Sequence, residues 1–172
     1  MYIGEDNVLV ELAQMEEAKP CMRIIDDARA FQQAQGFTQW TKEYPTLKDI
    51  RNDIANQKGY VVRVDGKVVG YMCIDFAGEP AYDKIEGAWS TDEPYAVVHR
   101  LAISEEYRGK QLTRLVFELI ESICLQQDIH AIRVDTDGEN KRMQYVLQKR
   151  GFAPCGVVEF GGGPKLAFDK QI

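Results

Sequence analysis

A short basic stretch, YRGKQLTRLV from Tyr107 to Val116, has the residue types of an anion-binding site. It follows a predicted strand and opens a predicted helix, so several main-chain N–H groups without helical partners meet at one point. Arg108, Lys110 and Arg114 place three cations around that point. Basic residues at a helix amino terminus oppose the helix dipole unless an anion binds there. This conflict favours a pyrophosphate site over a basic surface turn.

The elements that would position this loop follow a mixed α/β order. Alternating apolar residues predict strands, and apolar residues every three or four positions predict helices. Asp65-Gly66 between two such strands predicts a tight hairpin, because both turn residues need a positive φ. The strands are expected at Val8–Leu12, Tyr60–Val64, Lys67–Phe76, Tyr95–Ile103, Ala131–Asp135, Val157–Phe160 and Leu166–Phe168. The helices are expected at Met15–Gln35, Thr46–Lys58, Leu112–Cys124 and Asn140–Arg150, with a loop at Gly78–Glu93.

Length and charge limit the classes of function. The chain has 172 residues, 45% of them hydrophobic, which predicts one globular domain over residues 1–172. Its net charge of −6 argues against a nucleic-acid or anionic-membrane partner, since either would need a basic surface, and is compatible with a cationic substrate. No apolar run reaches the roughly 20 residues that span a bilayer. The acidic amino terminus lacks the order of a signal peptide.

The cysteines and histidines predict a reduced protein without a metal. The four cysteines lie far apart with no CxxC pair, which is typical of cytoplasmic proteins. His99 and His130 do not have the spacing of metal ligands and have no cysteine close by in sequence. We therefore expect a cytoplasmic location and no metal site.

Two stretches together resemble the GNAT N-acetyltransferase superfamily. HRLAISEEYRGKQLTRLVFELIE, from His99 to Glu121, is similar to its acetyl-CoA-binding segment, whose loop has the form [QR]-x-x-G-x-[GA]. DTDGENKRMQYVLQKRGF, from Asp135 to Phe152, is similar to the next motif of strand, Asn, helix and Lys-x-Gly-Phe. The resemblance extends over about Val8 to Phe168. It implies an α/β fold with a mixed, mostly antiparallel sheet, a splayed central strand pair and flanking helices.

The resemblance also implies where the cofactor binds. Free main-chain groups of the splayed strand would pair with the pantetheine arm of acetyl-CoA, and loop N–H groups would hold the pyrophosphate. Arg108 would lie alongside the pyrophosphate, and Asn140 would steady the cofactor from the next helix. The implied strand residues are Leu101, Ala102 and Ile103, and the implied loop residues are Gly109, Lys110, Gln111, Leu112 and Thr113.

Some positions depart from the family pattern. Gln111 stands where a glycine is usual, and Thr113 where a small glycine or alanine is usual. Main-chain donors survive any side chain, and the Thr113 hydroxyl could itself donate to a phosphate. Many family members carry a tyrosine general acid seven residues after the Asn, a position that Leu147 occupies here. Tyr145 lies about 200° away around a helix and does not count as its replacement.

Acetyl transfer to an amine needs a route for the amine proton and donors for the developing oxyanion. The N–H of Leu101 or Ala102 could serve the oxyanion. The splayed strand lacks the glutamate that often serves as base, so His99, which titrates near neutrality, and Glu86 are the candidate bases. Cys155 is a candidate proton donor near the thioester. The alternatives are a packed or surface strand histidine, a solvated loop carboxylate and a buried apolar thiol.

Four aromatic residues could wall the acceptor pocket: Phe37, Trp40, Tyr44 and Trp89. In the family, the segment after the first helix lies over that pocket. The alternative is that these side chains cap the core from a loop.

These expectations combine into one function. The sequence predicts an acetyl-CoA-dependent N-acetyltransferase that moves an acetyl group to a primary amine of a small molecule or peptide, by direct transfer in a ternary complex. The alternatives are a non-catalytic acetyl-CoA-binding sensor or interaction module and an acyltransferase that uses a longer acyl-CoA. The sequence does not identify the acceptor, and homodimers are common among similar proteins.

Overall fold

Short-range signals determine several elements of the chain. The computed structural model describes residues 7–36, 39–109 and 111–172. Asp65 and Gly66 have φ values of 51° and 81°, so the predicted hairpin turn is confirmed. Thr46 caps the second helix: its hydroxyl accepts from the Asp49 N–H at 3.3 Å, and the Asp49 carboxylate accepts from the Thr46 N–H at 2.7 Å. This reciprocal pair confirms where that helix begins.

The chain divides into two compact units, Met1–Ile74 with Arg100–Ile120 and Asp75–His99 with Glu121–Ile172. The first unit contains β1 (Val8–Leu12), α1 (Ala18–Ala34), α2 (Leu47–Ala55), β2 (Gly59–Val64) and β3 (Lys67–Asp75). The second contains β4 (Glu86–Gly87), β6 (Ala131–Thr136), α4 (Lys141–Lys149), β7 (Ala153–Phe160) and β8 (Gly163–Gln171). Both units share β5 (Ala96–Ile103) and α3 (Leu112–Gln126). Short 3-10 turns lie at Met15–Glu17, Pro80–Lys84 and Glu105–Tyr107.

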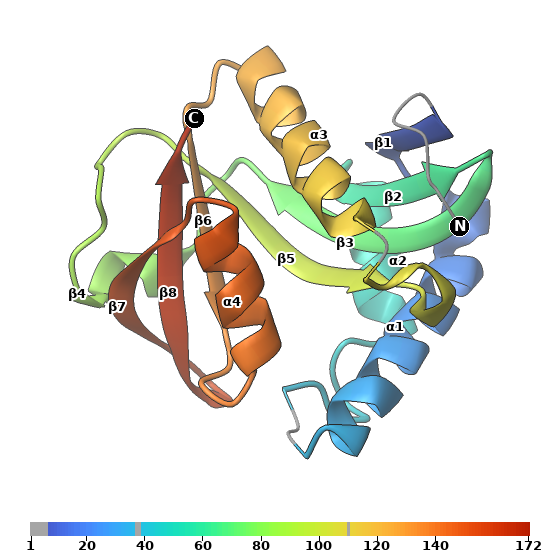
Figure 1. Ribbon diagram of the computed structural model, residues 1–172, viewed down its shortest axis with the longest axis horizontal. Helices are drawn as coiled ribbons and strands as arrows, with labels where there is room; N and C mark the ends of the chain where they lie inside the picture. Colours follow the sequence, from blue (N-terminus) through green and yellow to red (C-terminus); the bar gives the residue numbers. More distant parts are fainter. Residues whose placement is uncertain (1–6, 37–38, 110) are drawn as a thin grey trace. The chain divides into compact units, whose positions relative to one another are not determined.

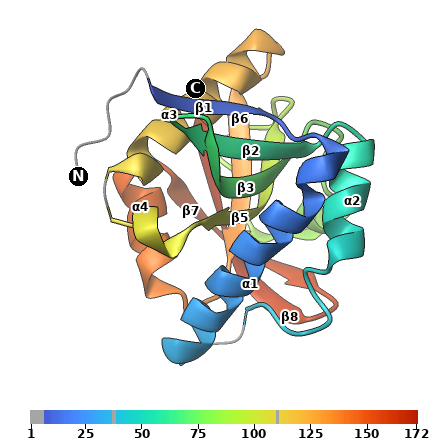
Figure 2. The same ribbon diagram turned by 90° about the vertical axis from the view of Figure 1, so that its right-hand side faces the viewer.

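In the first unit, α1 and α2 lie next to each other against the β-strands (Figures 1 and 2). Their buried faces form a core cluster with β2, β3 and β5. The cluster includes Cys21, Ile24, Ile25, Ala28, Ile50, Ile54, Val61, Tyr71 and Ala102. The amphipathic spacing predicted for both helices therefore serves this core.

In the second unit, α4 lies across the strands β6, β7 and β8 (Figure 1). The β7–β8 hairpin is longer than the predicted strands Val157–Phe160 and Leu166–Phe168, because Phe160 pairs with Gly163 across a two-residue turn. Proline and glycine near the start of β7 obscured its alternating pattern, and the ladder shifts its register between Pro154 and Gly156.

The region expected to be a loop, Gly78–Glu93, contains a 3-10 turn and the two-residue strand β4. β4 is too short to show any periodicity in sequence. It exists because it pairs with β7, Glu86 opposite Val157 and Gly87 opposite Gly156. This pairing is non-local, so the prediction of an open loop was wrong for these residues.

The strands form an eight-stranded sheet in the order β1-β2-β3-β5-β6-β8-β7-β4. β1 with β2, β2 with β3, β4 with β7, β6 with β8 and β7 with β8 pair antiparallel. β5 pairs with β6 in parallel through two residue pairs, Ala96 with Ile132 and Val97 with Arg133. A mixed, mostly antiparallel sheet flanked by helices confirms the predicted fold class.

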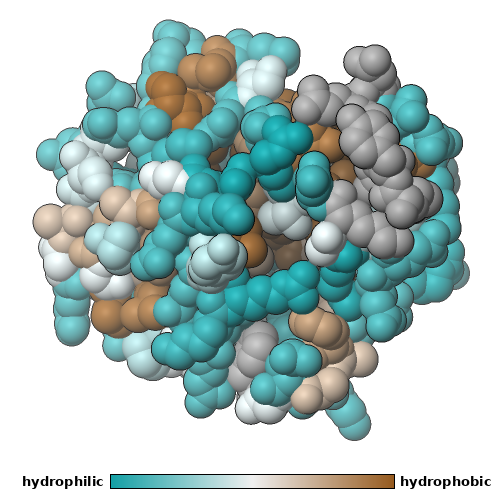
Figure 3. Space-filling model, in the orientation of Figure 1, coloured by the Kyte–Doolittle hydropathy of each residue, from teal (hydrophilic) through white to brown (hydrophobic). Residues whose placement is uncertain are grey.

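The surface seen in Figure 3 is mostly hydrophilic, with apolar side chains in small groups. Among the residues that the structure describes, no helix is long and apolar enough to cross a membrane.

Candidate active site

Two described residues of the loop between β5 and α3 have the backbone conformation that favours glycine. Gly109 and Gln111 have φ values of 73° and 64°, in the left-handed region that favours glycine. A Cβ built on Gly109 would meet nothing within 4 Å, so its backbone faces open space. Leu112 begins α3 and is fully buried, whereas Gln111, directly before it, is exposed. The first N–H groups of α3 therefore begin at a turn that a ligand can approach.

Arg108 ties this loop to the end of β5. Its Nε donates to the Ile103 carbonyl at 3.0 Å, and its guanidinium carbon lies 4.6 Å from the centre of the Phe31 ring. Arg114, the third residue of α3, forms an (i, i+4) ion pair with Glu118 at 2.7 Å. Lys110 lies outside the described residues.

The candidate pantetheine-binding strand follows an unusual residue. Arg100 has a φ of 55° in the middle of β5, directly before Leu101, Ala102 and Ile103. Ala102 is buried, whereas Leu101 and Ile103 are half-buried. β3 approaches closely, because a Cβ on Gly70 would lie 3.1 Å from the Ala102 carbonyl oxygen.

Sequence reasoning missed a buried polar cluster around Arg100. Its guanidinium donates to both carboxylate oxygens of Asp53, at 2.9 and 2.5 Å, and to the Tyr44 hydroxyl at 2.8 Å. The Tyr71 hydroxyl donates to Asp53 at 2.6 Å. Burial next to this carboxylate raises the pKa of Tyr71 well above its usual value, so Tyr71 keeps its proton. The signal in sequence was an arginine beside His99 in a mostly apolar strand.

Among the candidate catalytic residues, His99 has a carboxylate close by. Its Nε2 lies 3.8 Å from Oε2 of Glu79, and the two side chains are 18% and 25% exposed. A second such contact joins Tyr82 to Asp135, whose carboxylate accepts from the Tyr82 hydroxyl at 2.6 Å. Burial raises the pKa of both Tyr82 and Asp135, so this pair keeps the tyrosine protonated.

Glu86 and Cys155 lie on the paired strands β4 and β7. Glu86 is exposed. The Cys155 thiol donates to the Ala153 carbonyl at 3.4 Å and lies 4.0 Å from the Ser90 hydroxyl. Burial, with a smaller effect of Asp169, raises the pKa of Cys155 above its usual value. The thiol is therefore protonated at neutral pH.

Two glycines bring these strands together. A Cβ on Gly87 would overlap the Cys155 carbonyl oxygen, and a Cβ on Gly156 would overlap the Glu86 carbonyl oxygen. The Ala88 N–H also donates to the Cys155 carbonyl at 3.0 Å. The main chain of each candidate residue is thus packed against the other strand, Cys155 against Gly87 and Ala88, and Glu86 against Gly156.

The predicted aromatic wall has members in different environments. Trp40 is 6% exposed and belongs to the core cluster of the first unit, as the core-capping alternative expects. Tyr44 is 42% exposed, with its hydroxyl held by Arg100. Trp89 packs on Tyr82 at 5.0 Å between ring centres, in the second unit. Phe37 lies outside the described residues.

Asn140 occupies the N-cap of α4, where its side-chain oxygen accepts from the Met143 N–H at 3.1 Å. Leu147, in the position of the missing tyrosine, is 1% exposed. Tyr145 is 63% exposed on the same helix. The two side chains therefore occupy opposite environments, as their helical spacing predicts.

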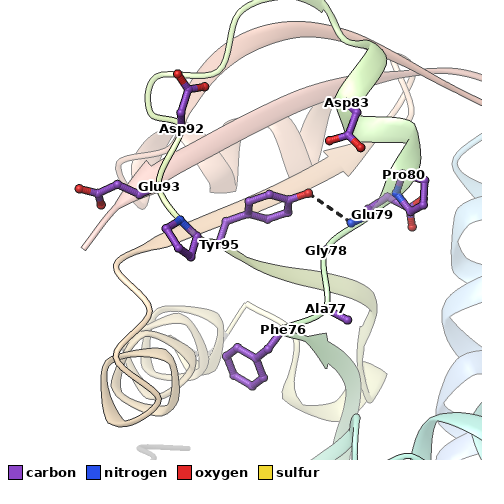
Figure 4. A pocket seen from close by; sticks show the side chains of 10 residues that line it. Phe76, Ala77, Gly78, Glu79, Pro80, Asp83, Asp92, Glu93 and Tyr95 are labelled. Atoms are coloured by element: carbon purple, nitrogen blue, oxygen red, sulfur yellow. Dashed lines mark hydrogen bonds between the residues drawn. The ribbon is translucent and has the colours of Figure 1, made fainter.

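The second unit contains an acidic pocket of about 460 Å³. Four carboxylates line it, from Glu79, Asp83, Asp92 and Glu93, together with the ring of Tyr95 (Figure 4). The Tyr95 hydroxyl accepts from the Glu79 N–H at 3.2 Å and joins the two walls. Because its charged side chains are all acidic, the pocket favours a cationic ligand.

Comparison with known proteins agrees with this architecture. A sequence profile described as the acetyltransferase (GNAT) family matches residues 23–152. The crystal structure of a GNAT-family acetyltransferase from Streptococcus agalactiae is 32% identical, with a TM-score of 0.87 over 96% of this chain and 95% of that one.

More distant relatives have named acceptors. A protein of Bacillus subtilis (strain 168), provisionally assigned as a [ribosomal protein bS18]-alanine N-acetyltransferase, is 25% identical over 138 residues, 79% of this chain and 80% of the relative. A structure of AAC(6')-Ib with ribostamycin and coenzyme A shares the fold, with 18% identity and a TM-score of 0.70 over 96% and 94% of the two chains. The family match over residues 23–152 and the shared fold show that this chain belongs to the GNAT acetyltransferase family and is an N-acetyltransferase.

Proposed function

We propose that this enzyme transfers an acetyl group from acetyl-CoA to a primary amine of a small molecule or peptide, by direct transfer in a ternary complex. The observation that carries the proposal is the turn before α3, where both Gly109 and Gln111 adopt the left-handed conformation. Gln111 thus has the backbone conformation that a glycine would have. A glutamine where the family usually has a glycine is therefore compatible with an anion-binding turn.

The donor set fits acetyl-CoA. Main-chain N–H groups at the start of α3 and the positive end of its dipole suit a pyrophosphate, with Arg108 on the same loop. Thr113, half-buried in the first turn, adds a hydroxyl. When bound, acetyl-CoA supplies the acyl group as a thioester. A complex of AAC(6')-Ib with acetyl-CoA supports this choice of donor.

The chain also provides groups for the proton transfers. His99, next to Glu79, can accept the proton of the attacking amine, directly or through water. Its alternative as base is Glu86, which is exposed. Cys155 is protonated at neutral pH and can return a proton to the leaving thiolate. The Leu101 or Ala102 N–H can donate to the oxyanion.

The acidic pocket supports a positively charged acceptor. A primary amine with a lysine-like pKa near ~10.4 is a cation at neutral pH, and additional ammonium groups would strengthen its attraction to four carboxylates. The named relatives act on amines of both kinds that we propose, a protein amino group and an aminoglycoside. The free thiols of the described cysteines are typical of a reducing compartment and support a cytoplasmic location.

Two measurements test this function in sequence. Thermal shift with CoA, acetyl-CoA and longer acyl-CoAs should show stabilisation by CoA and acetyl-CoA, and no stabilisation by any of them would refute the proposal. Release of free CoA thiol should then be followed over polyamines, aminoglycosides, amino acids and amino-terminal peptides. Turnover with an amine, at a KM that rises with salt, is expected. Cofactor binding without turnover on any amine would contradict the amine acceptor.

A further inference from the structure

Arg100 interrupts β5 in a conformation that its own residue type disfavours. Its φ of 55° lies in the left-handed region, which non-glycine residues inside strands rarely adopt. Such a residue persists only where the surrounding structure holds it. A single left-handed residue also redirects the strand that follows it, and here that strand is Leu101–Ile103.

The side chain of Arg100 has the contacts that could hold it there. Nε and Nη2 donate to Oδ2 and Oδ1 of Asp53, at 2.9 and 2.5 Å, in a bidentate pair with an α2 residue. Nη1 donates to the Tyr44 hydroxyl at 2.8 Å, in the segment between α1 and α2. The Arg100 and Asp53 side chains are only 15% and 9% exposed, so water competes little for these bonds.

Asp53 is itself fixed from a third element. The Tyr71 hydroxyl of β3 donates to Oδ2 at 2.6 Å, the same oxygen that Nε of Arg100 contacts. Burial, the largest single effect, disfavours the charged form of Arg100. The hydrogen bonds to Asp53 and the electrostatic effects of Tyr44, Asp53 and Cys73 together exceed it, so the pKa of Arg100 is raised. Arg100 therefore stays charged across the pH range in which the enzyme would work.

A role in stability alone explains this arrangement poorly. A buried ion pair contributes little net stability, because desolvation offsets most of the attraction, and apolar residues often replace such pairs without loss. The two parallel hydrogen bonds to Asp53 do fix the orientation of Arg100. Arg100 comes directly before the candidate pantetheine-binding main chain.

We propose that Arg100 is a positioning residue. Its bidentate hydrogen bonds to Asp53 hold the left-handed conformation in β5 and thereby orient the main-chain N–H and C=O groups of Leu101–Ile103 towards the cofactor. The inference rests on the proposed use of acetyl-CoA. Asp53 serves the same role because it accepts these hydrogen bonds, and Tyr71 serves it because its hydroxyl holds Asp53 in place. None of the three residues needs to contact the reacting atoms.

Glycine and alanine at position 100 separate the backbone from the side chain. Both Arg100→Gly and Arg100→Ala remove the guanidinium and leave Asp53 without it. Glycine accepts a φ of 55° freely, whereas alanine is driven towards the extended region. If CoA binding depends on the left-handed backbone at position 100, Arg100→Gly should keep most of the CoA affinity that Arg100→Ala loses. A role in packing or charge alone predicts equal losses.

The experiment is isothermal titration of CoA into wild type, Arg100→Gly and Arg100→Ala, with circular dichroism to confirm folding. We expect Arg100→Ala to bind about tenfold more weakly and Arg100→Gly to stay within about threefold of wild type. Because an unpaired buried Asp53 can unfold either variant, the same comparison is made in an Asp53→Asn background, where the carboxylate charge is absent.

The outcomes are distinct. Equal CoA affinities for the glycine and alanine variants, in whichever background folds, would overturn the positioning role, as would an alanine variant that binds like wild type. Wild type that binds no CoA would instead refute the proposed function. Arg100→Lys keeps the charge but not the fork, so its CoA affinity should fall between those of wild type and Arg100→Ala.

Discussion

The Nε2 atom of His99 lies 3.8 Å from the Oε2 atom of Glu79, at the wall of an acidic pocket. A carboxylate at this distance can orient an imidazole and stabilise its cationic form after it accepts a proton. His99 is thereby favoured over Glu86, which is exposed on the two-residue strand β4.

Replacement of His99 by alanine should therefore lower kcat by about 10²-fold and remove the limb of the pH–rate profile that reports the base. Steady-state rates from pH 5.5 to 9 measure both effects. His130→Ala is the matched control, because it removes the other histidine, which is half-exposed beside Asp128. A pH profile unchanged in His99→Ala would leave Glu86, or water alone, as the base.

Replacement of Arg108 by alanine should weaken CoA binding by about tenfold. The side chain links the Ile103 carbonyl to the loop, so its loss removes both a charge and a support of that loop. Titration of CoA at two salt concentrations measures the effect. Arg51→Ala removes the same charge from an exposed position of α2 and should leave the affinity unchanged. Equal affinities of Arg108→Ala and wild type would exclude Arg108 from the pyrophosphate site.

Replacement of Gln111 by glycine should raise stability by about 0.5–1 kcal/mol, because a glutamine at a φ of 64° is strained and glycine is not. Thermal unfolding should show a rise of about 2–4 °C, with CoA binding retained. Gly109→Ala, at a φ of 73°, tests the opposite change and should lower the melting temperature. A glycine variant less stable than wild type would mean that the Gln111 side chain makes a compensating contact.

Replacement of Glu17 by glutamine should lower stability by about 1 kcal/mol at pH 7 but not at pH 3. Hydrogen bonds from Arg63, at 2.8 and 3.0 Å, lower the pKa of Glu17 below its ordinary value of 4.5. A lowered folded-state pKa gives stability that is present above about pH 4.5 and lost as the pH falls through the folded value. Calorimetry at both pH values measures the difference, with the exposed neighbour Glu16→Gln as control. A difference that persists at pH 3 would contradict the ionic origin.

Iodoacetamide should alkylate Cys155 slowly, and the buried Cys21 and Cys124 more slowly still. Burial raises the pKa of Cys155, and it raises those of Cys21 and Cys124 to about 12, so few thiolates exist at pH 8. Peptide mass spectrometry after timed iodoacetamide treatment should show Cys155 modified before the other two, and all three slower than in the denatured chain. Modification of Cys155 as fast as in the denatured chain would show that its thiol is ionised.

Local patterns in the sequence were enough to predict most elements. The Thr46–Asp49 capping pair, the Asp65-Gly66 turn and the apolar stripe of α3 each act within a few residues, so their structures follow from neighbours in the chain. The second helix ends at Ala55 and not at Lys58, since Gln57 takes a φ of 59°.

What escaped prediction depends on residues that meet only in three dimensions. Asp53 and Arg100 are 47 positions apart, and Asp53 and Tyr71 are 18 apart, so no window of sequence contains their contacts. The strand β4 depends on β7 in the same way. Likewise, the left-handed turn at Gln111 is invisible to residue preference, because glutamine rarely adopts it.

The facing glycines of β4 and β7 have a practical consequence for altering acceptor preference by directed evolution. A Cβ at position 87 or 156 would overlap the main chain of the other strand. Neither position therefore accepts a side chain while β4 stays paired with β7. Mutant libraries should therefore hold both constant and vary the carboxylates of the proposed acceptor pocket instead. Any variant recovered with a larger residue at one of them will have released β4, and with it the hydrogen bond from the Ala88 N–H to the Cys155 carbonyl.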